Sequence, residues 1–534
     1  MRKTLTVFLI SIFSFGFLTA MNLGVLAVHA IPERPGNPGA PATLGAPGGQ
    51  LDSSSVSYSG TTEISSDTNA SGEKYYSDEA GKNALLFSGG ISTLINPTIE
   101  KYGDSSGENS DFYGINAAVL AYNGATVDIS GGTIETKGSY ANAVFAYGDA
   151  VVNISDTEIK TAANNSGGIM VTGGGTLNAK NLTVETQGNS SAAIRSDRGG
   201  GTENIDGGTY TTNGVGSPAI YSTADVSVSN ATLNSTVSEG AVIEGLNTIT
   251  LTNTIVNNSN TELNGNSETY KNIFIYQSMS GDAEEGTGTF SAKNSTLNES
   301  HGDNFFVTNT SAKITLENNK FNNTSEEFVF LKATSGKWGN AGSNGGNVSL
   351  SAINQNLKGD FVIDDVSSLA LNLTQGSYLL GAINSAHTAK KSDISLDDSS
   401  IWVLTADSYV DSLDNSVAAT KNIYSNGYTL YVDGSAVATN PETPPAMDES
   451  DDGADLSITS VEQSESAVNT ELSEPDINKE NKDDALWWVL GGVAGGIIIA
   501  IIIILLLIKK KPTKAPAESS PEIELPRSPS GHQS

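Results

Sequence analysis

The chain has 534 residues, and its 28 basic and 60 acidic residues give a formal net charge of −32. It contains no cysteine, so a disulfide framework is excluded. The acidity argues against nucleic acid as a partner, because phosphate contacts need clustered lysine and arginine. Abundant Gly, Ser, Thr and Asn, with few helix formers, indicate an all-β protein with many turns.

The N-terminus has the pattern of a secretory signal. Two basic residues precede an apolar stretch from Leu5 to Val28, and Ala30 supplies a small residue at the expected cleavage point. We therefore expect residues 1–30 to be a cleaved signal peptide. Residues 31–50 are rich in Pro and Gly and are expected to form a linker.

The middle of the chain repeats itself, and three short apolar runs recur together in each repeat. The first run is centred on Val119, Val144, Ile169, Ile194, Ile220 and Val242. Each run alternates apolar and polar residues over three to five positions, which is typical of a strand with one buried face. Three strands in each repeat predict a three-sided, right-handed parallel β-helix of about 14 coils over residues 51–435. Successive centres of the first run lie 22–26 residues apart. An antiparallel β-sandwich is the alternative, and it would not impose a repeat of about 25 residues.

One turn recurs two residues after the end of the second run in each repeat. The residue there is always Gly, Asn or Asp: Gly131, Asp156, Asn181, Gly207, Asn230, Asn253, Asn294 and Asn318. These residue types tolerate a positive φ better than others do. A two-residue corner between strands requires one such conformation, so we expect a left-handed residue at each of these positions.

Four longer gaps interrupt the repeats, at residues 100–114, 257–271, 276–289 and 332–347. They are rich in Gly, Ser and Asn, and we expect loops that leave one side of the β-helix and could carry function. From residue 397 to residue 435 the spacing changes and aromatic residues concentrate. We interpret this segment as a C-terminal cap that covers the last coil.

The corner series and the ending WVLTADSYV (402–410) with NGYTLYV (426–432) resemble the pectin-lyase-like β-helix superfamily. Within it, the chain is most similar to adhesin-like surface proteins of bacteria. The resemblance implies a bacterial cell surface. It leaves the activity open, because the superfamily includes lyases and glycosidases as well as adhesins.

The C-terminal part predicts a membrane anchor. Residues 436–485 are acidic and poor in aromatic residues, as in a disordered stalk. Residues 486–508 are uncharged, begin Leu-Trp-Trp and are long enough for a transmembrane helix. Lysines follow at once, so residues 509–534 are expected inside the cell and the repeats outside. A GxxxG pair, Gly491 and Gly495, would allow a homodimer through the span.

The two arginines between residues 35 and 526, Arg195 and Arg198, flank Asp197. They follow the first strand of one repeat and precede three glycines. Two interpretations remain open. The group is a solvated turn with a local ion pair, or it binds a ligand such as the carboxylate of a glycan.

We predict no catalytic residues. His301-Gly302 and Asp364-Asp365 resemble segments of polygalacturonase-type glycosidases, but they occur here in the opposite chain order. A ladder of acids on neighbouring coils would be the pattern of a glycosidase. Asp128 is expected beside asparagines in the following coils, which interrupts such a ladder.

No cofactor or metal site is predicted. Residues 448–453 begin like a Ca²⁺ loop, but Thr459 stands where an EF-hand requires a glutamate, so Ca²⁺ binding has no specific motif. The leading hypothesis is a non-catalytic, adhesin-like surface protein that binds an extracellular glycan or protein. The alternatives are a membrane-tethered polysaccharide lyase or glycoside hydrolase, and a structural component of the cell envelope.

Overall fold

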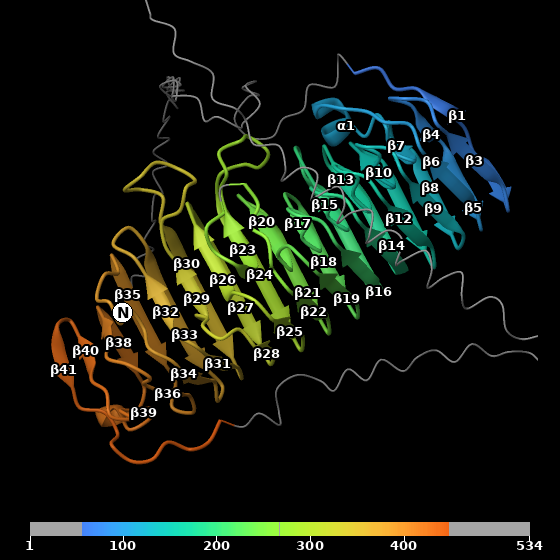
Figure 1. Cartoon of the computed structure of the whole chain (residues 1–534). Helices are drawn as coiled ribbons and strands as arrows, with labels where there is room; N and C mark the ends of the chain where they lie inside the picture. The colour runs from blue at the N-terminus through green and yellow to red at the C-terminus, as the bar shows by residue number, and fades with distance from the viewer. Residues whose placement is uncertain (1–55, 266, 448–534) are drawn as a thin grey trace, which may run out of the picture. The chain divides into compact units, whose positions relative to one another are not determined.

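The computed structural model describes residues 56–265 and 267–447 (Figure 1). The expected signal peptide, the linker at 31–50, most of the stalk, the span at 486–508 and the tail all lie outside these residues. Among the described residues, no helix has the length and apolar character needed to cross a bilayer.

The described chain is a parallel β-solenoid of about 15 turns, close to the 14 expected, and it is consistent with right-handed winding. One sheet of 12 strands collects the first strand of successive turns and is called the first sheet below. Its strands are β1 (Gly60–Ile64), β4 (Asn83–Phe87), β7 (Val119–Ala121), β10 (Val144–Tyr147), β13 (Ile169–Thr172), β15 (Ile194–Ser196), β17 (Ile220–Ser222), β20 (Ala241–Glu244), β23 (Lys271–Tyr276), β26 (Asp303–Thr308), β29 (Leu331–Ala333) and β32 (Phe361–Ile363).

The second sheet has 22 strands and bends at one corner in each turn. Strands before the corner are β2 (Thr68–Ser71), β5 (Ile91–Ile95), β8 (Thr126–Ser130), β11 (Val151–Ser155), β18 (Asp225–Ser229), β21 (Thr248–Thr252), β24 (Thr287–Lys293), β27 (Thr310–Glu317), β30 (Gly346–Ile353), β33 (Ser368–Thr374), β35 (Lys391–Leu396) and β38 (Ser412–Asn415). Strands after it are β3 (Lys74–Ser77), β6 (Thr98–Lys101), β9 (Thr133–Thr136), β12 (Glu158–Thr161), β19 (Thr232–Ser235), β22 (Ile255–Asn258), β25 (Thr296–Glu299) and β28 (Lys320–Asn323). In two turns a single strand, β14 (Gly175–Thr186) or β16 (Gly201–Thr212), runs through the corner.

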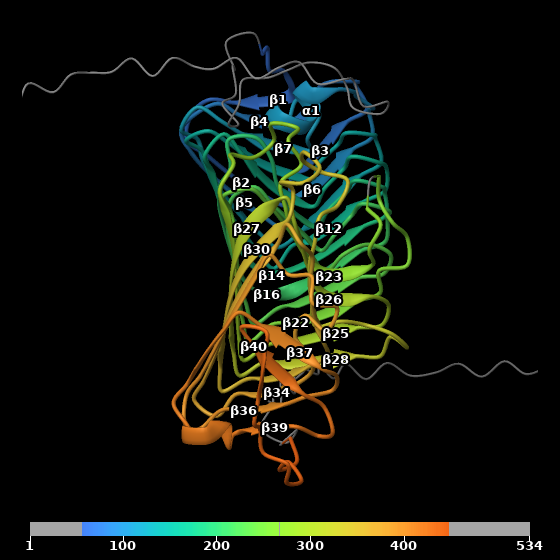
Figure 2. The ribbon, with the colours of Figure 1, turned by 90° about the vertical axis from the view of Figure 1, so that its left-hand side faces the viewer.

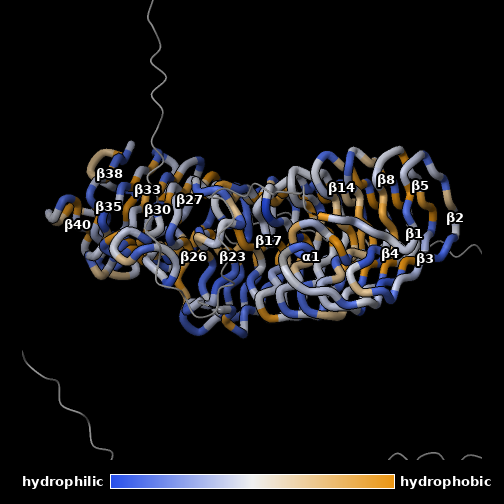
Figure 3. The backbone as a smooth tube through the Cα atoms, turned by 90° about the horizontal axis from the view of Figure 1, so that it is seen from above, coloured by the Kyte–Doolittle hydropathy of each residue, from blue (hydrophilic) through white to orange (hydrophobic). Residues whose placement is uncertain are grey.

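Each strand pairs in parallel with its counterpart one turn along, as the repeats predicted. Val144, for example, lies opposite Val119 on one side and Ile169 on the other. Figure 2 shows the turns stacked from β1 at one end to the last strands at the other. Inward side chains of all turns join one continuous apolar core, and Figure 3 shows hydrophobic positions recurring along successive strands.

The recurring corner has the backbone conformation that its residue types suggested. All eight corner residues have positive φ, between 49° at Asn253 and 75° at Gly207. Asn96 and Asn354, at φ 49° and 46°, occupy the same corner in an earlier and a later turn. Side-chain amides connect neighbouring corners, and Asn318 Nδ2 donates to Asn294 Oδ1 at 2.9 Å.

The segment from 397 to 435 continues the winding for most of its length. A four-stranded sheet pairs β31 (Asn356–Lys358), β34 (Tyr378–Leu380), β36 (Ile401–Val403) and β39 (Ile423–Tyr424) in parallel. In the last sheet, β37 (Ser408–Val410) pairs in parallel with β40 (Leu430–Val432). Only β41 (Ser435–Val437) reverses direction, against β40, and this antiparallel strand ends the stack. Trp402 is fully buried, and its Nε1 donates to the Gly381 carbonyl at 2.9 Å.

Candidate ligand-binding site

Loops fold back over the outer face of the first sheet. One apolar cluster on this face contains Leu120, Phe145 and Met170, and a second contains Phe274 and Phe306. The short helix α1 (Glu108–Tyr113) belongs to the loop between β6 and β7, and the segment 277–286 connects β23 to β24. Tyr113 of α1 packs against Tyr147 of β10, with ring centres 5.7 Å apart, and Trp338 from the loop at 332–347 packs against Phe274 at 5.3 Å, so loops form part of the packed structure on this face.

Arg195 stands on the outward row of the first sheet, between Met170 and Tyr221. Its Nη2 lies 3.3 Å from Asp111 Oδ1 on α1 and 3.2 Å from Asp197 Oδ2, and only 9% of the residue is exposed. Burial raises the pKa of Asp197 to about 8, with a further contribution from the Asp282 carboxylate and an opposing one from Arg195. This ion-pair group ties α1 to the turn that contains β15.

Arg198 makes the corresponding connection to the second loop. Its Nε donates to Asp282 Oδ1 at 2.8 Å, and its guanidinium lies 4.0 Å from the centre of the Phe112 ring on α1. Arg198 therefore contacts α1 and the segment 277–286 together. Both side chains of the Arg198–Asp282 pair are mostly buried, at 16% and 23% exposure, so solvent screens this pair less than a surface pair.

Glu244 fixes the start of the same loop. Its carboxylate accepts hydrogen bonds from Tyr221 Oη at 2.6 Å, from Tyr276 Oη at 3.0 Å and from the Ser278 backbone N–H at 3.2 Å. The Ser278 hydroxyl also donates to it. Burial raises the pKa of Glu244, and the donated hydrogen bonds oppose that rise. The segment 277–286 is thus held at its beginning by Glu244 and at its middle by Arg198.

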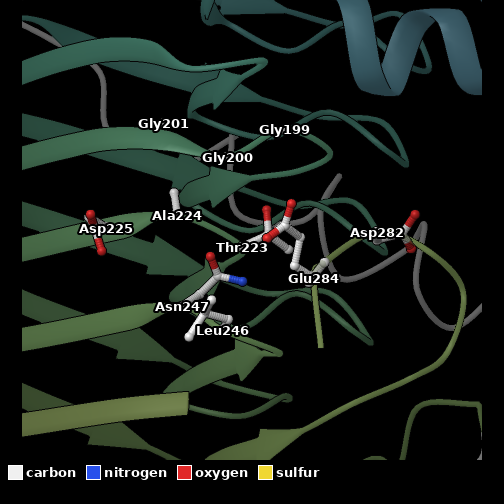
Figure 4. A pocket seen from close by; sticks show the side chains of 11 residues that line it. Gly199, Gly200, Gly201, Thr223, Ala224, Asp225, Leu246, Asn247, Asp282 and Glu284 are labelled. Carbon is white, nitrogen blue, oxygen red and sulfur yellow. The ribbon is translucent and has the colours of Figure 1, made fainter. Parts of the chain in front are cut away.

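A pocket of about 260 Å³ opens beside this held loop (Figure 4). Its walls come from three successive turns and the loop: Gly199, Gly200, Gly201, Thr223, Ala224, Asp225, Leu246, Asn247, Asp282, Ala283 and Glu284. Asp225 and Glu284 are exposed, and neither carboxylate forms an ion pair or a side-chain hydrogen bond with the described residues. Leu246 is 54% exposed at the rim. The site therefore offers unpaired negative charge, an amide, one hydroxyl and an apolar edge.

None of the three sequence-predicted residues lines the pocket, although they directly precede its glycine wall in the chain. Arg195, Asp197 and Arg198 lie next to the glycine wall, and both arginines are paired with carboxylates of the same chain. They do not form the solvated turn that was one interpretation, because Arg195 and Asp197 are buried. Their role in binding a ligand stays a prediction, and the geometry gives them the role of holding the loops.

Several residues of the pocket carried no signal in the sequence. Asp225 is the first residue of β18 and resembles many other outward polar positions. Asp282 and Glu284 lie in the gap at 276–289, whose path over the first sheet depends on contacts with residues about 80 positions earlier. The gap itself was the one feature of the sequence that pointed to Asp282 and Glu284.

The other candidate residues have structural surroundings. His301 packs edge-on against Tyr270, with ring centres 4.4 Å apart. Asp364 accepts hydrogen bonds from the Ser335 backbone N–H at 2.7 Å and from Ser367 Oγ at 2.5 Å. Asp128 lies in a polar column rather than an acid ladder. It accepts from Asn153 Nδ2 at 2.7 Å, and the amides of Asn178 and Asn204 continue that column.

No three Asp, Glu, His or Cys side chains lie close enough to hold a metal ion in the part of the chain that the structure describes. No family model, no curated protein and no solved structure matches the chain. The parallel β-solenoid therefore rests on the structure alone. Membership of the pectin-lyase-like superfamily remains a proposal that the repeats and the corner residues support.

Proposed function

We propose that this chain is a non-catalytic, adhesin-like protein of a bacterial cell surface, anchored through residues 486–508, which binds an extracellular ligand beside the first sheet. One observation carries the proposal. Two loops far apart in sequence are held to a single turn by Arg195 and Arg198, and a solvent-open pocket adjoins them. Holding loops with buried ion pairs is typical of a pre-organised binding surface.

The rest of the solenoid is suited to the role of a spacer. Its second sheet presents short polar side chains in regular rows, such as Thr248, Thr250 and Thr252 on β21. The acidic stretch at 436–485 would hold this solenoid away from the membrane, because a charged chain of 50 residues extends by self-repulsion.

A binding assay on the full chain tests the proposal. Cells that display the protein, and the detergent-solubilised full chain, would be applied to a glycan panel and to layers of other cells. We expect saturable binding that cells without the protein lack, and a reduction of that binding in Arg198→Met, which releases Asp282. Absence of binding to every surface would contradict the proposal.

A membrane-tethered glycoside hydrolase is the second candidate, favoured by the two unpaired carboxylates in one pocket. An inverting hydrolase needs one carboxyl as acid and another as base, about 6.5–9.5 Å apart. Release of new reducing ends from polysaccharides by the full chain, lost in Asp225→Asn and in Glu284→Gln, would establish this function in place of binding alone.

A further inference from the structure

The pocket between Gly199–Gly201 and the segment 282–284 has a chemistry that selects among extracellular ligands. Its free charges are negative, because Asp225 and Glu284 are unpaired whereas Arg198 is engaged by Asp282. An anionic sugar such as a uronate would therefore meet two carboxylates and no available guanidinium. A ligand that carries positive charge would gain an ion pair at the same positions.

A second observation is independent of the acids. Thr223 lines the pocket and is only 3% exposed, and its Oγ1 has no hydrogen-bond partner among the described residues. Buried hydroxyls are normally paired, so an unpaired one in a pocket wall indicates a partner that the folded chain does not supply. Figure 4 shows Thr223 and Glu284 in the middle of the pocket, with Asp225 on one side and Asp282 on the other.

The remaining walls favour a sugar ring. Asn247 contributes a side-chain amide, one N–H of which donates to the Glu244 carbonyl, and Leu246 offers an exposed aliphatic surface. At about 260 Å³ the pocket is slightly smaller than the roughly 300–1,000 Å³ of sites that take drug-sized ligands. A single ring with hydroxyls on its rim and C–H groups on its face matches this size and this mixture of groups better than an extended peptide.

The geometry points to a cationic amino sugar within a glycan chain as the ligand of this pocket. The carboxylates of Asp225 and Glu284 both attract its ammonium, its hydroxyls bond to Asn247 and Thr223, and one face of its ring packs on Leu246. Because the carboxylates do not converge into a metal-binding group, they suit a ligand that spans the pocket. This inference rests on the proposed function and specifies its ligand class.

The test measures binding of glucosamine oligomers to the detergent-solubilised full chain at pH 6, where the sugar amines are protonated. N-acetylglucosamine oligomers, oligogalacturonate and oligolysine serve as comparison ligands. We expect the glucosamine oligomer to bind more tightly than all three. Asp225→Asn and Glu284→Gln should each weaken it about tenfold, as expected for loss of one charged hydrogen bond. Glu285→Gln, an exposed neighbour outside the pocket wall, should leave the affinity unchanged.

The assignment would be overturned by a preference for oligogalacturonate, by equal binding of oligolysine or of the N-acetylglucosamine oligomer, or by equal effects of the pocket variants and Glu285→Gln. Circular dichroism of each variant separates lost binding from lost folding, and the ranking of ligands on the unmodified chain needs no variant. If the chain still adheres to cells or other glycans while glucosamine oligomers fail to bind, the ligand class is wrong and the proposed function stands. Failure to bind any surface contradicts both.

Discussion

The two kinds of connection between strands differ in how their structure is determined. The corner inside the second sheet has the same conformation in turn after turn, with φ between 46° and 75° at Asn354, Gly207 and the equivalent residues. The loops beside the first sheet differ in length and are held by contacts such as Arg195–Asp111 and Arg198–Asp282. Where a connection is as short as possible, backbone sterics select the residue type. Where it is long, individual side-chain contacts define the structure, and there a binding site can arise.

The largest effect on stability is expected where the loops are held beside the first sheet. Arg195→Met should lower the free energy of unfolding by about 3–5 kcal/mol, because the buried guanidinium contacts Asp111 on α1 and Asp197 on its own turn, and the variant removes both contacts. Hydrogen exchange should increase in the segment 104–116. Urea denaturation and exchange mass spectrometry measure the two effects.

A matched ion pair at the surface provides the control. Lys337 and Glu268 are 2.8 Å apart, with side chains 56% and 59% exposed, so Lys337→Met should cost less than about 1 kcal/mol. Similar losses in the two variants would show that Arg195 does not hold the loops by a buried interaction.

The next largest effect on stability is expected in the apolar core that the first and second sheets enclose. Glu203 is fully buried among apolar residues, and neither oxygen has a partner among the described residues. Glu203→Leu should stabilise the fold by about 1–3 kcal/mol at neutral pH, since it removes an unsatisfied buried group. Thermal unfolding of the variant and of the original chain measures this difference.

The same residue predicts a pH dependence. Burial raises the pKa of Glu203 well above its ordinary value, so the folded chain keeps a proton that the unfolded chain releases near pH 4.3. Proton binding by Glu203 therefore contributes fully to the free energy of unfolding below about pH 4.3. This contribution is lost as the pH rises towards the pKa of Glu203 in the folded chain. The stability advantage of Glu203→Leu should grow between pH 5 and pH 9. A constant advantage would mean that Glu203 is ionised in the folded chain.

A smaller effect is expected at the corner. Asn181 has φ 52°, and Asn181→Val should destabilise by about 1–2 kcal/mol, because a β-branched residue is disfavoured in that conformation. Asn181→Gly keeps the conformation accessible and loses only the 3.3 Å contact with Asp156. Valine should therefore lower the melting temperature more than glycine does, and the opposite order would contradict the role assigned to φ.

The smallest effect is expected in the polar column on the second sheet. Asn153→Ala removes the hydrogen bonds to Asp128 and from Asn178, at 2.7 Å and 2.9 Å, on a partly exposed face. The loss should be about 0.5–1.5 kcal/mol by urea denaturation. Ligand binding should be unchanged, since Asn153 lies on β11 and does not line the pocket. A loss of binding in Asn153→Ala would instead indicate that the ligand binds to the outer face of the second sheet.

The solenoid could be predicted from the sequence because its local rules repeat. The alternation around Val119, Val144 and Ile169 gave the strand register, and the corner residues gave the turn between strands. The end of the stack was less predictable. The aromatic segment from 397 indicated a cap, yet its strands β36 and β39 continue the parallel winding, and only β41 reverses.

The candidate site could be predicted only in part. Arg195 and Arg198 were conspicuous as rare arginines in an acidic chain. Their partners Asp111 and Asp282 lie 84 residues away in opposite directions, and no periodic pattern relates such positions. The unpaired carboxylates Asp225 and Glu284 became visible only once three turns and one loop were placed together.

Hydrogen exchange on the full chain with and without a glucosamine oligomer tests the central contrast between the two regions most directly. We predict that the ligand increases protection at 199–201, 223–225 and 282–284, and leaves the recurring corner from 129 to 131 and its equivalents unchanged. Protection along the strands of the second sheet, with none in the segment 282–284, would contradict this account. It would indicate that the ligand binds to the outer face of the second sheet.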